Sequence, residues 1–172
     1  MLKGNRIYLR LIEIKDIRRL YDLCNDEEVK KYNNQLTHSE KNKALLKNIN
    51  NIGLGLKKAL SIINEKNVLV GFITYKQIMH SKDIYSIGIT IGKMYWNRGY
   101  GEDSINTLIK YLFNDLNALR IELEVVCSNL RAIRCYKKCG FVEEGRKRNG
   151  YYIDGEEMDI IIMGILKKEM VL

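Results

Sequence analysis

Arg98, Gly99 and Gly101 place a positive charge beside two glycines, between a β-prone run and an amphipathic run. A glycine turn that opens a helix lets backbone N–H groups approach an anion without a Cβ in the way. The helix dipole also favours negative charge at that end. The stretch Trp96-Asn97-Arg98-Gly99-Tyr100-Gly101 therefore indicates a phosphate site, with a purely structural turn between strand and helix as its alternative.

The same glycines come close to a dinucleotide fingerprint. Gly99-x-Gly101-x-x-Ser104 departs from Gly-x-Gly-x-x-Gly/Ala at its last position, and Glu122 lies near the spacing at which an acidic residue contacts a ribose. That fingerprint normally lies near the start of a repeated βαβ series, whereas several β-prone runs precede it here. A phosphate loop with Gly-Lys-Ser or Gly-Lys-Thr is excluded, because the sequence contains neither.

A second pattern follows downstream. Asn129-x-x-Ala132-x-x-x-Tyr136-x-x-x-Gly140-Phe141 places Asn129 at the start of a short helix and Gly140 at its C-terminal end. Alone, it indicates a capped helix with a core tyrosine. Together, the two patterns resemble the signature motifs of the GNAT superfamily of N-acetyltransferases. Three further segments are similar to its ribosomal-protein N-acetyltransferase branch: residues 6–11, 26–29 and 154–159.

The resemblance covers most of the chain and implies an α+β fold. We expect a single domain over residues 1–172, built on a mixed, mostly antiparallel sheet of six to seven strands flanked by helices. Two parallel strands, residues 84–92 and 120–127, are expected to splay apart. Acetyl-CoA, as co-substrate, is expected to bind where they separate, and no metal is expected.

The resemblance also implies which residues bind the cofactor. Backbone groups from Ile91 to Lys93 are expected to pair with the pantetheine arm, and the segment from Arg98 to Asp103 is expected to surround the pyrophosphate. Trp96 stands where the family usually has Gln or Arg, so we expect the backbone amides to carry most of the pyrophosphate binding. The implied cofactor-binding residues are Ile91, Gly92, Lys93, Arg98, Gly99, Tyr100, Gly101, Glu102, Asp103, Asn129 and Arg131.

Two residues match catalytic positions of the family. Tyr136 matches the general acid; a phenol with an ordinary pKa of about 10 can protonate a thiolate whose conjugate acid lies near 8.5. Glu124 matches a catalytic glutamate, with an exposed or ion-paired strand residue as the alternative. A backbone N–H near Ile91 is the expected donor to the negative charge that develops on the thioester oxygen.

The elements that position these residues follow from hydrophobic periodicity. Helices are predicted after a cap at Asp16, over 27–32, from a capping box at Thr37 and Glu40, over 103–116 and over 130–138. A long hairpin loop is predicted over 149–155. The predicted strands are 7–12, 59–63, 68–78, 84–92, 120–127, 141–145 and 158–166.

Composition limits the remaining choices. The 172 residues carry a net charge of +8, which favours an anionic partner. No apolar run is long enough to span a membrane, the N-terminus lacks a signal-like apolar segment, and the four cysteines lack paired metal-ligand spacing. We therefore expect a cytoplasmic protein with reduced thiols, without a membrane partner or a requirement for nucleic acid, and compatible with a homodimer.

The acceptor is expected to be a primary amine, first the N-terminal amine of a ribosomal protein, with a polyamine or an aminoglycoside as alternatives. Acidic side chains in the segments expected on the substrate side would attract a cationic acceptor. They are Asp26, Glu27, Glu28, Asp154, Glu156 and Glu157. Two other classes stay open on the residues alone: a nucleotide-binding oxidoreductase and a basic RNA- or ribosome-binding module.

Overall fold

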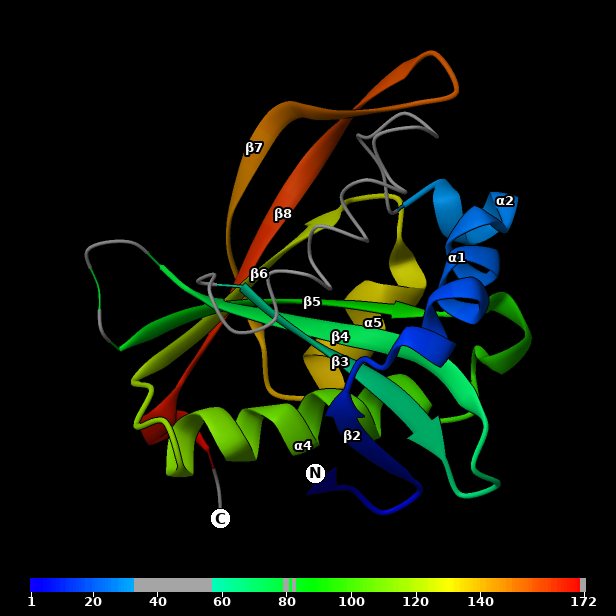
Figure 1. Ribbon diagram of the computed structural model, residues 1–172. Helices are drawn as coiled ribbons and strands as arrows, with labels where there is room; N and C mark the ends of the chain where they lie inside the picture. Colours follow the sequence, from blue (N-terminus) through cyan, green and yellow to red (C-terminus); the bar gives the residue numbers. More distant parts are fainter. Residues whose placement is uncertain (33–56, 79–80, 82, 171–172) are drawn as a thin grey trace.

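One mixed sheet runs through the protein. The computed structural model describes residues 1–32, 57–78, 81 and 83–170, and the helical region predicted from Thr37 lies outside them. The sheet has eight strands in the order β1-β2-β3-β4-β5-β6-β8-β7 (Figure 1). The strands are β1 (Leu2–Lys3), β2 (Ile7–Leu11), β3 (Lys57–Asn64), β4 (Leu69–Gln77), β5 (Ile84–Ile91), β6 (Arg120–Val126), β7 (Val142–Ile153) and β8 (Glu156–Leu166).

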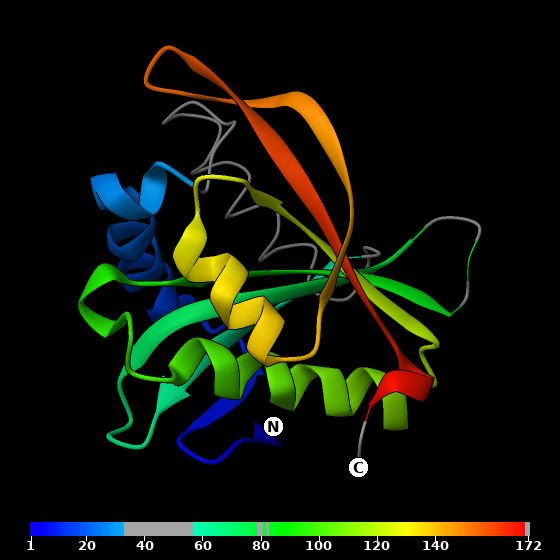
Figure 2. The same ribbon diagram turned by 180° about the vertical axis from the view of Figure 1, so that it is seen from behind.

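The predicted fold class is confirmed, with one strand more than expected because the short β1 pairs with β2. Strand β5 pairs with β4 along its whole length but with β6, in parallel, only at Ile84–Ser86 against Arg120–Glu122. Beyond these residues the two strands separate. Figure 2 shows β6, β8 and β7 rising away from β5, with α5 (Leu130–Lys138) beside the opening. The predicted splay is therefore present.

Helices lie on both faces of the sheet. Figures 1 and 2 show α4 (Tyr100–Asn114) and α5 on one face, and α1 (Ile17–Asn25) and α2 (Glu27–Lys30) on the other. Helix α4 buries Ile105, Leu108, Ile109 and Leu112 completely or nearly so against the sheet. Such a stripe at helical spacing keeps the N-terminus of α4 fixed relative to β5. Short 3₁₀ turns complete the chain: η1 (Ile14–Asp16), η2 (Lys93–Tyr95) and η3 (Lys167–Glu169).

The predicted long loop over 149–155 is wrong. Strand β7 continues to Ile153 and β8 begins at Glu156, so the connection is Asp154-Gly155. Both residues have positive φ, 51° and 90°. Asp-Gly favours the tight hairpin turn in which both central residues have positive φ. Polar residues near Asn149 suggested a loop, but they belong to an irregular stretch of β7 between Lys147 and Tyr151.

Asp16 is the N-cap residue of α1, as predicted, but its side chain makes no capping hydrogen bond to that helix because the carboxylate bonds elsewhere. It accepts hydrogen bonds from Arg10 Nη1 and Nη2 at 2.6 and 2.8 Å, and from Ser61 Oγ at 2.8 Å. The side chain is almost fully buried. A buried carboxylate requires such partners, so Asp16 joins β2 to β3.

None of the helices in the described part of the chain is long and apolar enough to cross a membrane.

Candidate active site

The open edge of β5 carries backbone groups that β6 does not satisfy. Gly92 N–H donates to Val70 O at 2.9 Å, so Gly92 faces β4. Because hydrogen-bonding direction alternates along an antiparallel ladder, Ile91 and Ile89 face the opposite way, into the splay. The β5–β6 pairing ends at Ser86, before either residue. Their N–H groups therefore border the opening, where an extended ligand can pair with β5.

All three expected pantetheine-binding residues, Ile91, Gly92 and Lys93, use their backbone carbonyls within the protein. Gly92 O accepts a hydrogen bond from Tyr95 N–H at 2.9 Å, and Lys93 O accepts one from Trp96 N–H at 3.2 Å. Ile91 O accepts a bond from Trp96 Nε1 at 2.7 Å. The N–H of Ile91 is thus the group best placed to meet a ligand in the splay.

The glycine turn opens α4 as predicted, though the helix begins at Tyr100 and not at Asp103. Gly99 is the N-cap, in the left-handed region with φ of 80°. Asp103 N–H donates to Gly99 O at 3.0 Å and begins the intrahelical bonding. The N–H groups of Tyr100, Gly101 and Glu102 precede that bond and lack intrahelical acceptors. They form the anion-binding end of a helix.

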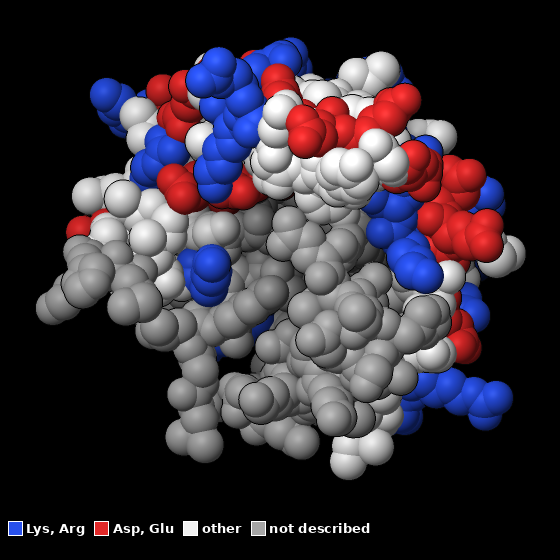
Figure 3. Space-filling view, turned by 90° about the horizontal axis from the view of Figure 1, so that it is seen from above, with Lys and Arg blue, Asp and Glu red and all other residues white. Residues whose placement is uncertain are grey.

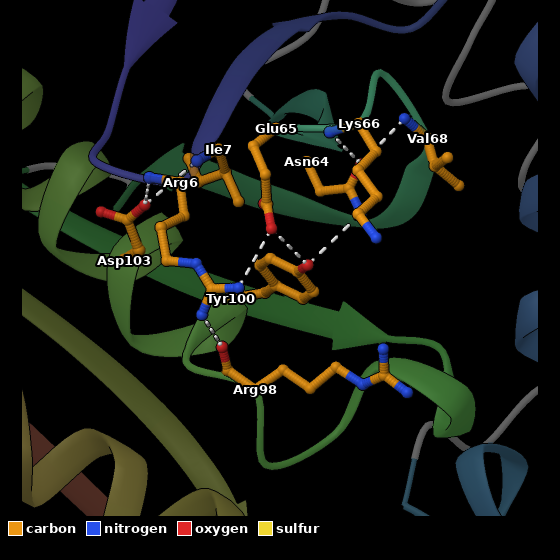
Figure 4. Close-up of polar contacts among 9 residues, drawn as sticks. All are labelled: Arg6, Ile7, Asn64, Glu65, Lys66, Val68, Arg98, Tyr100 and Asp103. Carbon is orange, nitrogen blue, oxygen red and sulfur yellow. Dashed lines mark hydrogen bonds and ion pairs between the residues drawn. The ribbon is translucent and has the colours of Figure 1, made fainter.

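Asp103 supports this turn from outside. Its carboxylate accepts backbone bonds from Asn5 at 3.0 Å, Arg6 at 2.7 Å and Ile7 at 3.1 Å. Figure 4 shows the carboxylate of Asp103 beside Arg6 and Ile7. Because the N–H of Asp103 is also bonded to Gly99 O, its amide and its carboxylate are both engaged in the fold. Its predicted contact with the cofactor therefore finds no support in these contacts.

Arg6 also holds the turn, and the sequence analysis missed it. Its Nη1 donates to Arg98 O at 2.8 Å, its Nη2 pairs with Glu65 at 3.0 Å, and its guanidinium lies 5.0 Å from the ring centroid of Tyr100. Figure 4 shows these side chains meeting, with the Arg98 side chain extending away from them. No local signal reveals Arg6, because the contact with Arg98 spans 92 positions.

The start of α5 lies near the glycine turn. Asn129 Oδ1 caps the helix by accepting from Ala132 N–H at 3.2 Å, which confirms its predicted place. The Arg131 guanidinium lies over Trp96, 3.8 Å from the ring centroid. Burial lowers the pKa of Arg131. Within the described residues it forms no ion pair, so its charge is available to an anion.

Tyr136 projects from α5 into the core and packs edge-on against Phe141, with ring centroids 6.0 Å apart. Burial raises the pKa of the Tyr136 phenol, and the guanidinium of Arg131 opposes that shift only in part. The phenol therefore stays protonated at neutral pH. Its oxygen makes no hydrogen bond to another described residue, so its proton is available for transfer.

Glu124 is half-exposed on β6 and forms an ion pair with Lys147 of β7. Lys147 lies between Arg146 and Arg148 in a short basic run of β7. Glu122, the candidate ribose ligand, is engaged by Arg120 at 3.1 Å. Arg120 also pairs with Glu144 at 2.5 Å, and this hydrogen bond lowers the pKa of Glu144. Of the two β6 glutamates, Glu124 lies beyond the end of the β5–β6 pairing.

A sheet that splays between two parallel strands, with a glycine turn at one side and a capped helix at the other, defines an acyl-CoA transferase site. A family model described as "Acetyltransferase (GNAT) domain" matches residues 6–142. The chain belongs to this GNAT acetyltransferase family. It is an acetyl-CoA-dependent N-acetyltransferase, and the resemblance seen in the motifs is confirmed.

Similar proteins span nearly the whole chain. An uncharacterized N-acetyltransferase, p20 of Bacillus licheniformis, is 29% identical, with 98% of this chain and 97% of that protein covered. The spermidine N(1)-acetyltransferase of Vibrio cholerae serotype O1 is 25% identical, with 96% of each covered. A crystal structure of spermidine N-acetyltransferase from Vibrio cholerae, in complex with CoA and spermine, has a TM-score of 0.84 and 24% identity, covering 96% of this chain and 98% of that one.

The geometry fits acetyl-CoA as the co-substrate. The unpaired edge of β5 suits the amide-bearing pantetheine arm, and the free amides of α4 with the unpaired Arg131 suit phosphates. In the described residues, no group of three or more His, Cys, Asp or Glu side chains is arranged to hold a metal ion.

Proposed function

We propose that the enzyme acetylates a polyamine, moving the acetyl group directly from acetyl-CoA to a primary amine of the acceptor. The observation that carries this proposal is a set of exposed acidic side chains on the side where the splay opens. They come from α2 and from the tip of the β7–β8 hairpin: Glu27, Glu28, Glu156 and Glu157. A flexible polycation is the acceptor whose charge best complements such a set.

Contacts between α2 and the hairpin bring these glutamates to one region. Lys31, directly after α2, pairs with Asp154 at 3.0 Å, and its carbonyl accepts from Tyr151 Oη at 3.5 Å. Figure 3 looks down on this side of the molecule and shows acidic side chains gathered there beside lysines and arginines. The full-length similarity to a spermidine acetyltransferase supports the same acceptor class.

Two of the acidic residues predicted to attract a cationic acceptor are already engaged within the protein. Asp154 is neutralised by Lys31. Asp26 caps α2, with its carboxylate accepting from the N–H groups of Glu28 and Val29. Exposed, unneutralised carboxylates attract a cation more strongly than carboxylates already paired. Glu27 and Glu28 are therefore the first residues to test.

In the proposed reaction, the neutral amine attacks the thioester carbonyl, the C–N bond forms and the C–S bond breaks. The N–H of Ile91 donates to the oxygen as negative charge develops on it. Tyr136 gives its proton to the departing thiolate, and Glu124 accepts the proton released by the amine, directly or through water. The roles of Ile91 and Tyr136 agree with the direction and hydrogen bonding of these groups. Glu124, in contrast, must leave its ion pair with Lys147 to accept a proton.

An N-terminal protein amine, the acceptor first expected from the sequence, is the competing proposal. The cytoplasmic location, the homodimer and independence of nucleic acid also stay predictions. An assay of free thiol released from acetyl-CoA, run with spermidine, spermine, an aminoglycoside and N-terminal peptides, separates the acceptors. We expect kcat/KM for spermidine to exceed that for any peptide by about tenfold or more, a difference of roughly 1.4 kcal/mol.

The double variant Glu27→Gln/Glu28→Gln is expected to raise KM for spermidine and leave kcat unchanged. Glu13→Gln, an exposed carboxylate before α1, is the matched control for a general change in surface charge. Turnover of an N-terminal peptide in preference to both polyamines would reject the proposal and return the protein amine to first place.

A further inference from the structure

Trp96 makes two directional contacts with parts of the site. It follows η2, the short turn between β5 and the glycine turn. Its indole Nε1 donates to Ile91 O at 2.7 Å, and the face of its ring lies under Arg131 at 3.8 Å. The first contact fixes the indole against the end of β5, and the second places a guanidinium on it.

The charged form of Arg131 needs a stabilising contact. Arg131 lies in the first turn of α5, and burial lowers its pKa because burial disfavours the charged form. Among the described residues, the groups that favour its charge electrostatically are Tyr136, Cys135 and Tyr32, none of them a carboxylate. An aromatic face stabilises a guanidinium without neutralising it. Stacking on Trp96 therefore keeps the charge of Arg131 in place and free for an anion.

We propose that Trp96 is a positioning residue for the pyrophosphate of acetyl-CoA: it holds the Arg131 guanidinium beside the glycine turn and binds no phosphate itself. The proposal rests on acetyl-CoA being the acyl donor. It adds a side-chain contribution to the expectation from the sequence that the backbone amides carry most of the pyrophosphate binding. It also gives a physical reason for an aromatic residue here, since the arginine comes from α5 and the tryptophan supplies its platform.

The test compares donors with and without phosphates. CoA binding is measured by calorimetry, and KM is measured for acetyl-CoA, acetyl-dephospho-CoA and S-acetylpantetheine. Trp96→Leu is expected to raise Kd for CoA, and KM for acetyl-CoA and acetyl-dephospho-CoA, by about 3- to 30-fold, the usual range for a cation–π contact. KM for S-acetylpantetheine, which lacks phosphates, and kcat are expected to stay within about twofold, a difference of about 0.4 kcal/mol.

Two more variants separate positioning from packing. Trp96→Phe keeps a ring face under Arg131 and is expected to fall between wild type and Trp96→Leu. In an Arg131→Gln background, Trp96→Leu is expected to add little, because contacting residues that act together are not additive. If Trp96→Leu does not fold, Trp96→Phe and Arg131→Gln are compared on the same donors.

The proposal would be overturned if Trp96→Leu weakened the binding of CoA and of S-acetylpantetheine equally. It would also be overturned if Trp96→Leu raised Kd for CoA by the same factor in the Arg131→Gln background as in the wild-type protein. An effect that disappears with acetyl-dephospho-CoA would also overturn it, because Arg131 would then contact the 3′-phosphate. Failure of the wild-type protein to bind CoA is a different result, since it would reject the donor itself and the proposed function with it.

Discussion

Tyr136 combines two properties that a proton donor requires. Burial raises the pKa of its phenol, so the group keeps its proton over the pH range in which an amine acceptor becomes neutral. Its oxygen forms no hydrogen bond within the described residues. The hydroxyl is therefore free to donate a hydrogen bond, and then its proton, to a departing thiolate.

Replacing Tyr136 by Phe is expected to lower kcat by about 10²- to 10⁴-fold, the usual contribution of general acid catalysis. Kd for acetyl-CoA should change little, because the ring and its contact with Phe141 remain. Since the pKa is raised, the loss should be constant from neutral pH to about pH 10, where an ordinary phenol begins to ionise. Measurement of kcat against pH checks this, and an unchanged kcat would remove Tyr136 from the mechanism.

Glu124 has a matched control on its own strand. Glu124→Gln is expected to lower kcat by about 10²-fold or more if this carboxylate accepts the proton of the amine. Glu122→Gln removes an equal charge from β6 at a carboxylate that is also ion-paired but lies where β5 and β6 are still paired, and it should leave kcat nearly unchanged. Both variants are assayed as kcat against pH. Identical profiles for wild type and Glu124→Gln would assign the proton to water or another group.

At the scale of elements, the two glycines of the turn differ in how much they tolerate an added side chain. Gly99 is left-handed, so an added side chain strains the backbone even though the nearest atom to a new Cβ, Arg6 Nη1, is 4.0 Å away. A Cβ at Gly101 would lie 3.6 Å from Cys135 Sγ and 3.9 Å from Ile91 Cγ1, which is ordinary contact. The space between α4, α5 and β5 at Gly101 therefore accommodates a methyl group.

Gly99→Ala is therefore expected to cost about 1–2 kcal/mol in the turn and to raise KM for acetyl-CoA by about 5- to 30-fold, the corresponding change in an equilibrium constant. Gly101→Ala has helical backbone and contact room, so it should change KM by less than about threefold. Thermal unfolding of both variants accompanies the kinetics. Equal increases in KM for the two variants would contradict the assignment of strain to Gly99 alone.

At the scale of the whole molecule, acid sensitivity should depend on Asp16. Burial alone raises the pKa of this carboxyl, but hydrogen bonds from Arg10, the Glu13 N–H and Ser61 outweigh it and leave the pKa below its ordinary value. A lowered pKa in the folded state means that the carboxylate adds stability above its unfolded pKa of about 3.9. That stability is lost as pH falls from there through the folded value.

Asp16→Asn is expected to lower the free energy of unfolding by about 1.5–3 kcal/mol at pH 7, the usual value of hydrogen bonds to a charged group. The difference from wild type should shrink below about pH 4. Urea unfolding at several pH values measures both. Glu13→Gln, whose side chain is 47% exposed and also pairs with Arg10, serves as control. A difference that does not depend on pH would show that the charge of Asp16 is unimportant.

Much of this protein was readable in its sequence. The glycine turn, the Asn129 cap, the stripe on α4 and most strands follow local rules of backbone geometry and periodicity, and the motif pair identified the family. The prediction of a long hairpin loop was wrong because Asn149 and its neighbours have the composition of a loop, yet pairing with β8 keeps them in strand β7. Asp16 lies at the N-cap of α1 as predicted, but its carboxylate bonds to Arg10 of β2 and Ser61 of β3 and makes no capping bond to the helix.

The sequence by itself determined the fold class and the residues that can bind a phosphate or donate a proton, because these depend on residue type and short spacing. Only the tertiary structure decided the contacts of those residues. Arg6 holds the glycine turn, Asp103 anchors the loop before β2, Lys147 pairs with Glu124, and Trp96 supports Arg131. Each contact joins segments far apart in the chain, and folding of the sheet and helices is what brings them together.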